Sequence, residues 1–445
     1  MDTLRRDALQ PYSNTVTTPN IFSFSKDSNV FENAIAPAPW TVPSHASLFT
    51  GMYPSEHGVH KEPEETLADE INTTRNRLMR LRQESLFFNL SSKGYTCYGI
   101  SSNPYLSPYS GFDEGFNIFN NIDFLGSSLK DEVEDLRKKY GDLSISNISN
   151  MISKGRVSDI HRVFRYRQHL KNFQKKNNLP SVKGGKPIVE TLNNSSIKEP
   201  FALFLNFMEM HEPYTKAEMS EGLFNPMASA PALHLYGIKP IKTKKIQSIR
   251  SAYYNEAKIL DSFFGQIIHF LKIMNLYENS LIILTSDHGQ ALNERNFYGH
   301  GIFLYDEIIR IPLIIKLPNE KKVSISNGYQ SLSDIRGFIL RCIEEQISED
   351  ILTKDVVFSE ESKRLRILPQ KYTGNLDNNT INASRKAVYK NGFKVTVNGS
   401  TGTLEEFLKN GLPVKPDTNA GVLDDLLNEL DIFKGNEKFL IPNRR

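Results

Sequence analysis

The sequence predicts an α/β protein, built as a three-layer α/β/α sandwich with a mainly parallel central sheet and a smaller α+β part at its C-terminal end. Two observations lead to this fold class. Apolar β-type runs alternate with amphipathic helical patterns along most of the chain, and such alternation favours parallel strands with helices on both faces. With 445 residues, 39% hydrophobic and 24% charged, the chain can also bury a large core.

Individual elements follow from local patterns. The helical stretch "ESLFFNLSSKG" stops at Gly94, a residue that suits the end of a helix, and a strand-like run over residues 95–103 follows it. A buried-strand run over residues 200–214 breaks into polar residues. A long amphipathic helix then leads to a strand over Ser280–Thr285 and a loop. A further strand covers residues 308–318.

The composition becomes more polar from about Asn319, which predicts a main domain over residues 1–318 and a smaller subdomain over residues 319–445. Within the second part, "GFKVTVNGSTGTLEEFL" predicts a strand pair with an Asn-Gly turn, followed by a helix. The tail after Ala420 has two short helical patterns and no cluster of reactive side chains.

Charge and cysteine content exclude several classes of protein. A net charge of +3 is too small to argue for nucleic-acid binding. Cys97 lies in a strand-like run and Cys342 in a helix-like run, so no disulfide framework is expected and a reducing compartment fits. No stretch approaches 18 apolar residues, and the N-terminus lacks an apolar signal core. We therefore expect a cytoplasmic protein without a transmembrane segment; the oligomeric state is not indicated.

The stretch "PWTVPSHASLFTG" over residues 39–51 has the pattern of a helix start. Pro43 suits the first helical position because its missing N–H would be unpaired there, and Ser44 to Phe49 continue the helix. Thr41 would then lie just outside the helix, beside unpaired backbone N–H groups that stabilise anions. Its hydroxyl is either a capping group, the commoner role, or a nucleophile.

Side chains capable of chemistry gather where predicted strands end, which is where functional groups collect in parallel sheets. The candidates are Asp287 and His288 after the strand at 280–285, His300 twelve residues later, Glu209, His211 and Glu212 after the run at 200, and Asp2 and Asp7 near the N-terminus. Carboxylate and imidazole together suit zinc or manganese, whereas an all-oxygen shell suits calcium or magnesium. Each residue alone also fits a plain turn or loop, but their co-occurrence favours a site.

Four stretches carry a family resemblance. They are "DTLRRDAL", "TPNIFSFSKDSNVFENAIAPAPWTVPSHASLFTGMYPSEHG", "FLNFMEMHEPY" and "SDHGQALNERNFYGHGIFLYDEIIRIPLIIKLP", in this order. They resemble the landmark motifs of the sulfatase family within the alkaline phosphatase superfamily. The resemblance covers most of the chain except roughly residues 126–198 and the last thirty. It implies an alkaline phosphatase-like fold, with a catalytic domain over residues 1–318 that contains a variable basic insertion over residues 126–198.

The resemblance also implies roles for individual residues. Asp2, Thr41, Asp287 and His288 would hold a divalent metal ion, either zinc, manganese or calcium, with Thr41 at the nucleophile position. His211 and His300 would contact the oxygens or the leaving group of an anionic ester. The substrate would be a small molecule, a glycan or a lipid headgroup. The implied activity is hydrolysis of sulfate or phosphate esters; transfer of a phospho group to a sugar or lipid, and a catalytically silent binding protein, are the alternatives.

The chain departs from the family pattern in its active-site motifs. Sulfatases typically carry Cys or Ser at position 41, converted to formylglycine, and Arg at the position of His45. Thr41 cannot form that aldehyde, so its hydroxyl would attack directly and pass through an ester on threonine. Phosphate or phosphonate esters are therefore as credible as sulfate esters. Gln290 stands where relatives commonly have Glu, for which we expect a modest effect beside the metal.

A further departure concerns the N-terminal side of Asp2. Members of the family carry an apolar strand just before this Asp, whereas the sequence here begins at Met1. Either the start codon is misplaced or the protein is a damaged relative, and we favour a misplaced start. Without that strand we expect Asp2 on a fraying end and its neighbours' backbone groups unpaired.

A basic stretch over residues 154–176 carries eight Lys or Arg against one Asp. Its apolar residues form a rough helical stripe. One hypothesis is a lid that attracts anionic substrate, with Arg162, Arg165 and Arg167 raising its local concentration. The plainer alternative, which we prefer, is a solvated amphipathic helix in an insertion.

Overall fold

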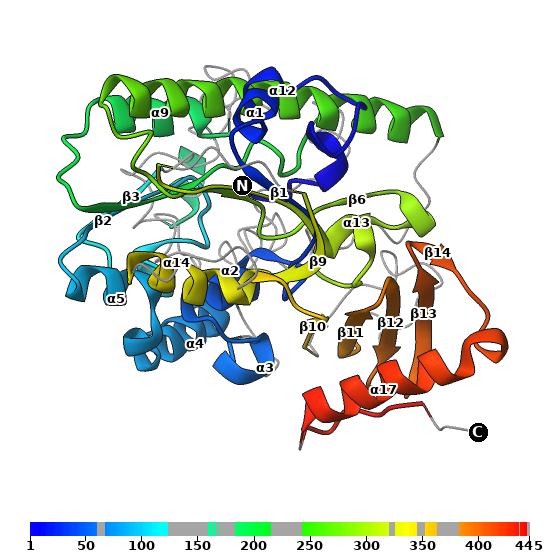
Figure 1. The fold of residues 1–445 in the computed structure, drawn as a ribbon. Helices are drawn as coiled ribbons and strands as arrows, with labels where there is room; N and C mark the ends of the chain where they lie inside the picture. The colour runs from blue at the N-terminus through cyan, green and yellow to red at the C-terminus, as the bar shows by residue number, and fades with distance from the viewer. Residues whose placement is uncertain are drawn as a thin grey trace.

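The structure, a computed structural model, describes residues 1–59, 67–122, 183–214, 243–319, 325–344, 352–362, 382–435 and 437–442, with a few residues between 159 and 168. Figure 1 shows a central layer of strands with helices on both faces, as predicted. The helices on one face are α1 (Pro19–Ser25), α9 (Gly185–Asn193) and α12 (Thr243–Ile273). On the other face lie α2 (Thr41–Thr50), α3 (Pro54–His57), α4 (Leu67–Arg80), α5 (Leu86–Ser92) and α14 (Ile335–Ile343).

The strands of the central layer form a four-stranded and a three-stranded sheet in the described residues. The first has the order β5 (Ile282–Thr285), β8 (Arg310–Lys316), β1 (Asn29–Ile35) and β9 (Ile325–Ser331). The second has the order β3 (Ile118–Asn121), β2 (Thr96–Ser101) and β4 (Phe201–Asn206). β1 pairs with β9, and β2 with both β3 and β4, in parallel.

β8 runs antiparallel to both of its neighbours, β1 and β5. The chain leaves β5 and forms the short pair β6 (Ala291–Leu292) and β7 (Tyr298–Gly299), followed by α13 (Asp306–Ile309). Since α13 runs directly into β8, the connection returns from the end of the sheet at which β5 stops. No helix crosses back over the sheet, as a parallel connection would require. The predicted strand at 308–318 is therefore present but reversed in direction.

The first two residues connect the two sheets at the carboxyl ends of β4 and β5. The amino group of Met1 donates a hydrogen bond to the Thr285 carbonyl at 3.0 Å. The Asp2 N–H donates to the Phe207 carbonyl at 2.8 Å. The Asp2 side chain is fully buried between these strand ends. The backbone next to Asp2 is thus paired on both sides.

Helices on both faces bury apolar residues against the central layer. On the α12 side, Tyr253, Leu260 and Phe264 pack in one core cluster with Ile314 of β8. On the opposite side, the core around Phe49 of α2 consists largely of aromatic rings. The predicted stop at Gly94 is confirmed, since α5 ends at Ser92 and Gly94 adopts a left-handed φ of 89°.

The C-terminal part is an antiparallel sheet covered by one helix (Figure 1). Its strands are β10 (Val356–Glu361), β11 (Arg385–Lys390), β12 (Phe393–Asn398), β13 (Thr403–Lys409) and β14 (Leu412–Pro413), and its helix is α17 (Ala420–Lys434). The helix predicted at the end of "GFKVTVNGSTGTLEEFL" is wrong, because that segment is β13, paired along its length with β12. The two short helices predicted in the tail are instead one continuous helix over 420–434.

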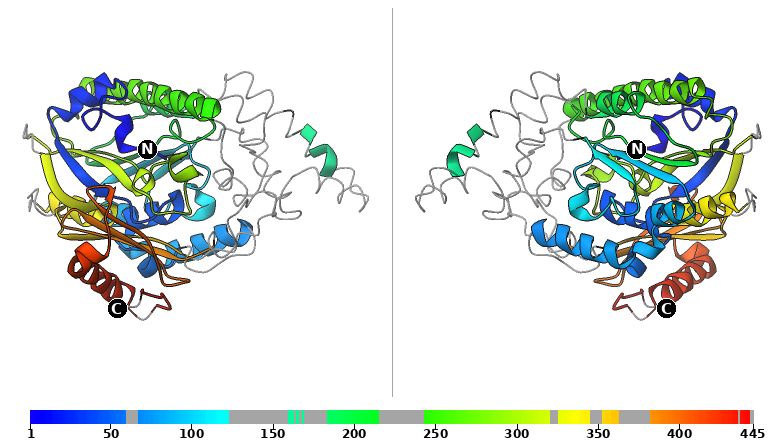
Figure 2. Two further views of the ribbon diagram at one scale, coloured as in Figure 1. Left: turned by 90° about the vertical axis from the view of Figure 1, so that its right-hand side faces the viewer. Right: turned by 90° about the vertical axis from the view of Figure 1, so that its left-hand side faces the viewer.

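The division at residue 318 remains a prediction. β9 and α14, which follow it in sequence, belong to the central layer and to its helical cover, and the antiparallel sheet starts at β10. Figure 2 shows α12 and α17 on opposite sides of the molecule. The basic stretch at 154–176 lies largely outside the described residues.

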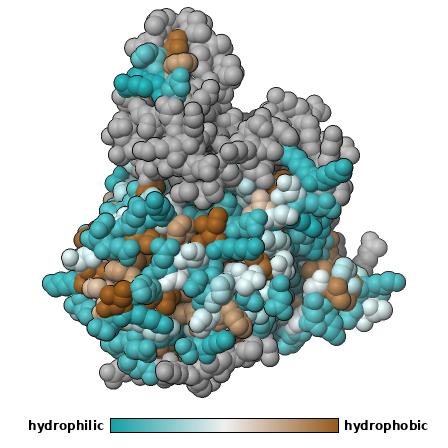
Figure 3. Space-filling model, turned by 90° about the horizontal axis from the view of Figure 1, so that it is seen from above, coloured by the Kyte–Doolittle hydropathy of each residue, from teal (hydrophilic) through white to brown (hydrophobic). Residues whose placement is uncertain are grey.

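The described helices include none that is long and apolar enough to span a membrane. Seen from the α12 side (Figure 3), the described surface is mainly hydrophilic, with hydrophobic residues in small groups.

Candidate active site

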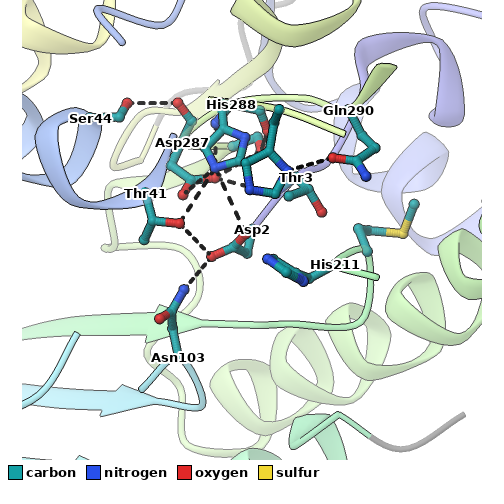
Figure 4. A network of polar contacts seen from close by, with 12 residues as sticks. Asp2, Thr3, Thr41, Ser44, Asn103, His211, Asp287, His288 and Gln290 are labelled. Carbon is teal, nitrogen blue, oxygen red and sulfur yellow. Dashed lines mark hydrogen bonds and ion pairs between the residues drawn. The ribbon is translucent and has the colours of Figure 1, made fainter. Parts of the chain in front are cut away.

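Four residues that the sequence analysis grouped meet at the carboxyl ends of the strands (Figure 4). Thr41 Oγ1 lies 3.4 Å from Asp2 Oδ2 and 3.5 Å from His288 Nε2. His288 Nε2 lies 3.4 Å from Asp287 Oδ2 and 4.0 Å from Asp2 Oδ1. All four side chains are buried. Residues separated by up to 286 positions are thus close enough to share one ligand.

Thr41 occupies the first turn of α2, whose preceding residue is Trp40. The helix therefore begins two residues earlier than predicted, and Thr41 lies inside it rather than just outside. Pro43 is tolerated because N–H groups of the first helical turn have no partner within the helix. The Thr41 hydroxyl is at the positive end of α2, as expected. Ser44 Oγ donates to the Asp287 carbonyl at 2.6 Å and ties the helix to the loop after β5.

The loop after β5 is tightly packed, so larger side chains would not fit in it. Gly289 N–H donates to the Ile308 carbonyl at 2.6 Å. A Cβ at Gly289 would lie 2.3 Å from the Glu307 carbonyl oxygen, which is a steric clash. Ser286 Oγ donates to the His288 carbonyl at 2.6 Å. The Ser-Asp-His-Gly sequence therefore folds back tightly and directs Asp287 and His288 toward Thr41.

The two buried aspartates strongly favour a bound cation. Asp2 Oδ1 and Asp287 Oδ2 have no hydrogen-bond partner although both atoms are buried. Burial, and secondly the charge of Asp287, raises the pKa of Asp2 to about 6. Burial likewise raises the pKa of Asp287 to about 6. Two carboxylates that share a water-poor site repel each other, and a divalent ion between them would remove that repulsion.

The protonation of His288 also fits a metal ligand. Burial lowers its pKa to about 4, so the imidazole is neutral at pH 7. Its Nδ1 lies 2.9 Å from the Gly289 carbonyl and donates to it, since a carbonyl can only accept. The lone pair of Nε2 then faces Asp2, Asp287 and Thr41. Two carboxylates, an imidazole and a hydroxyl make a mixed donor set that suits a divalent transition metal, and calcium less well.

Two further residues support this cluster and were missed by the sequence analysis as site residues. Asn103 Nδ2 donates to Asp2 Oδ2, and its position after the end of β2 was the signal that could have found it. His45 lies where the family pattern has a charged Arg. Burial among Phe49, Phe112 and Phe204 lowers its pKa to about 3, and its Nδ1 binds the Thr41 carbonyl. His45 therefore packs as a neutral ring.

His211 and His300 lie beside the cluster, and their contact with an ester stays a prediction. The ring of His300 is centred 4.5 Å from His288 and 5.2 Å from His211. His211, Glu212 and His300 also form a second group of convergent ligand atoms. Burial opposes protonation of His211, but the charges of Glu212 and Asp2 outweigh it and raise the pKa of His211. A protonated His211 can donate a hydrogen bond to an anion.

Lys183 supports the loop that carries His211. Its ammonium group donates to the carbonyls of Glu209 and His211 and lies 4.7 Å from the ring centre of Tyr214. Glu209 is buried behind the loop, where it accepts from the Gly185 N–H at 2.7 Å. Burial raises the pKa of Glu209, and the charge of Lys183 opposes this. Glu209 thus ties the loop to the first residue of α9.

Asp7, the remaining candidate, lies outside the cluster. It forms a double hydrogen bond with Arg5 at 2.7 and 2.8 Å, which holds its pKa below the ordinary value in spite of burial.

A cavity of about 450 Å³ lies between the central layer and the C-terminal sheet, lined by residues that include Arg310, Tyr329 and Asn391. None of its lining residues belongs to the cluster.

Comparisons with known proteins identify the family of the chain. The family model described as Sulfatase matches residues 1–344. The chain belongs to the sulfatase family. The sulfatase match includes Asp2, Thr41, His211, Asp287, His288 and His300.

Among relatives of this sulfatase-family chain, the Endo-4-O-sulfatase of Bacteroides thetaiotaomicron is 24% identical over 388 residues, which cover 84% of this chain and 72% of that protein. An arylsulfatase of Clostridium perfringens is 22% identical over 369 residues, covering 76% and 73%.

Solved structures of low sequence identity share the fold. A 2-O GAG sulfatase has a TM-score of 0.62 at 15% identity and covers 97% of this chain and 90% of its own. The phosphonate monoester hydrolase of Agrobacterium radiobacter has a TM-score of 0.59 at 16% identity, with coverages of 97% and 93%. These likenesses confirm the predicted alkaline phosphatase-like α/β fold.

Proposed function

We propose that this sulfatase-family hydrolase cleaves sulfate or phosphate esters in a metal-dependent reaction, with Thr41 as the nucleophile. The observation that carries the proposal is the meeting of the Thr41 hydroxyl with two buried, partly unpartnered carboxylates and the Nε2 of a neutral imidazole. A plain helix cap would need none of these groups. Nucleophilic catalysis needs an activated hydroxyl next to a stabilised anion site.

Asp2, Asp287, His288 and the Thr41 oxygen are the residues that would hold the divalent ion. Once bound, it would lower the pKa of the Thr41 hydroxyl and offset the negative charge of the ester. Asn103 keeps Asp2 oriented through its amide, and Ser44 keeps α2 in register with the loop after β5. These supports hold the Thr41 oxygen within reach of a phosphorus or sulfur atom.

Thr41 would release its hydroxyl proton to solvent and attack in line, so that a bond forms between its oxygen and the phosphorus or sulfur atom while the ester bond to the leaving alcohol breaks. The leaving oxygen takes a proton, for which His211 is a donor and His300 a partner. Water then cleaves the ester on Thr41 and regenerates the hydroxyl. Formylglycine plays no part because threonine cannot be converted to that aldehyde.

The names of the relatives favour a sulfated glycan as the substrate, whereas the phosphonate monoester hydrolase among the fold neighbours favours a phospho ester. Nitrophenyl sulfate, phosphate and phosphonate esters distinguish them. We expect turnover of at least one ester after loading with zinc, manganese or calcium, and loss of turnover after removal of the ion. Metal-loaded protein that hydrolyses no ester would contradict the proposal and leave a silent binding protein.

Transfer of a phospho group to a sugar or lipid acceptor is the enzymatic alternative, and it begins with the same attack by Thr41. Added glycerol or glucose separates the two. A hydrolase releases free phosphate at an unchanged rate, whereas a transferase converts the acceptor into a phospho ester.

Lys183→Met tests the support of the catalytic loop. We expect kcat for the preferred ester to fall about 10- to 100-fold, as is common when a partner of an active-site group is removed, because the carbonyls of Glu209 and His211 lose their common donor. Lys186→Met, on the exposed side of α9, is the matched control and should leave kcat unchanged. Wild-type kcat in Lys183→Met would exclude this role.

A further inference from the structure

A buried row of three hydrogen-bonded side chains runs from Glu212 to His300 and includes Gln290, one of the positions at which this protein departs from the family pattern. Gln290 Nε2 donates to Glu212 Oε2 at 3.0 Å. Gln290 Oε1 lies 2.6 Å from His300 Nδ1. Gln290 is fully buried, and the side chains of Glu212 and His300 are almost so. These three side chains connect the loop after β4 with the hairpin after β5.

The chemistry of the carboxylate sets the direction of every hydrogen bond in this row. A carboxylate can only accept, and the nitrogen of the Gln290 amide faces Glu212 Oε2 at 3.0 Å. The amide oxygen therefore faces His300, and it also can only accept. His300 must carry its proton on Nδ1. In the neutral ring, the basic nitrogen is then Nε2.

We propose that Glu212 and Gln290 are positioning residues that lock His300 in the Nδ1–H tautomer. The consequence for catalysis rests on the proposed function: the locked ring presents the lone pair of Nε2, and not an N–H, to any partner at that atom. Glu212 Oε2 also lies 3.9 Å from His300 Nδ1, on the same side of the ring as the amide of Gln290.

This arrangement explains why glutamine fits at position 290. A glutamate there would put a second carboxylate about 3 Å from that of Glu212, and like charges at this distance in a buried site repel strongly. The amide of Gln290 instead donates to Glu212 and faces His300 with its oxygen, so it orients the imidazole without adding charge. Gln290 is therefore more than a passive neighbour of the metal site.

The tautomer can be observed directly by NMR of protein labelled with ¹⁵N in its histidines, with the His300 signals assigned by their loss in His300→Gln. We expect His300 to show a protonated Nδ1 and an unprotonated Nε2 at pH 8. In Gln290→Met this preference should be lost, and kcat should fall about 10- to 100-fold with little change in KM. A protonated Nε2 with a bare Nδ1 in the wild-type protein would overturn the proposal.

An exchange of the two side chains provides the sharpest test. Glu212→Gln alone removes the charge that orients Gln290 and should release the tautomer. The double variant Glu212→Gln with Gln290→Glu restores an acceptor for Nδ1–H, with the amide now donating to the carboxylate. It should recover the tautomer and most of kcat. If the double variant is no better than Glu212→Gln alone, orientation by this row is refuted.

Gln330→Met is the control for the loss of a buried glutamine, because Gln330 is equally buried in β9 and belongs to no part of the candidate site. It should leave the His300 signals and kcat unchanged. The NMR measurement needs no turnover. A protein that hydrolyses none of the esters but shows the locked tautomer would thus contradict the proposed function and leave the positioning role intact.

Discussion

Thr41→Ala is expected to lower kcat for the preferred ester by about 10³- to 10⁶-fold, the range seen when a catalytic nucleophile is removed. The oxygen of Thr41 is both the attacking atom and a neighbour of Asp2 and His288, at 3.4 and 3.5 Å. Its loss removes the first chemical step but leaves the two aspartates and the imidazole in place. Bound metal should therefore persist at close to one ion per chain. Steady-state kinetics and metal analysis of the same sample measure both effects.

Thr50→Ala is the matched control, because Thr50 lies at the other end of α2 and donates to the Ala46 carbonyl within the helix. It should keep kcat within a factor of a few. Mass spectrometry of wild-type protein quenched during turnover should detect a phospho or sulfo adduct on Thr41. Retention of substantial kcat in Thr41→Ala would show that another group attacks.

Removal of bound metal is expected to destabilise the protein at neutral pH more than at acid pH. The pKa values of Asp2 and Asp287 are raised to about 6 in the folded metal-free chain, above their unfolded value of 3.8. Each of these carboxyl groups binds its proton more tightly in the folded chain than in the unfolded chain. The resulting stabilisation of the fold is therefore complete below pH 4 and is lost as the pH rises through 6. One unit of pKa shift corresponds to about 1.4 kcal/mol, so the loss is on the order of 3 kcal/mol per carboxylate.

Urea unfolding of metal-free protein at pH 4.5 and pH 7.5, with and without added manganese, measures this effect. Manganese should raise the free energy of unfolding more at pH 7.5 than at pH 4.5. The buried His45 and His288 have lowered pKa values and act in the opposite direction, so a variant is needed to isolate the aspartates.

Asp287→Asn provides that comparison. It should make the metal-free protein more stable than metal-free wild type at pH 7.5, and abolish the response to manganese. A variant less stable than wild type without metal at pH 7.5 would contradict the assigned repulsion. A matched substitution on the surface, Asp425→Asn in α17, should change neither measurement.

Most of the candidate site was accessible from the sequence because its residues directly follow predicted strands. Asp287 and His288 follow β5, His211 follows β4, and the structure brings them beside Thr41 because the strands end at one edge of the central layer. Asn103 also follows a strand end, but that position was its only signal, since an amide by itself does not indicate a reactive group. The link from Gln290 to Glu212 joins residues 78 positions apart and could not be seen from local patterns.

The elements that were predicted wrongly show where local patterns stop being informative. The segment Thr403–Lys409 has charged and apolar residues that suit a helix, yet it pairs with β12 and buries Phe407 and Leu408. Pairing with a neighbouring strand outweighs a weak helical preference. The direction of β8 could not be predicted either, because the apolar pattern of a strand is the same whether it pairs in parallel or antiparallel.

The sequence by itself indicated, through its resemblance to sulfatases, that Thr41 stands at the position of the aldehyde-forming residue, and that carboxylates and imidazoles follow the strands of an α/β fold. These are properties of residue identity and local spacing. Only the tertiary structure decided which of those groups meet, that the Nδ1 of His288 donates to the Gly289 carbonyl, and how far burial raises the pKa of the two aspartates. Electrostatic energies depend on distance and on exclusion of water, and both arise when segments far apart in the chain pack together.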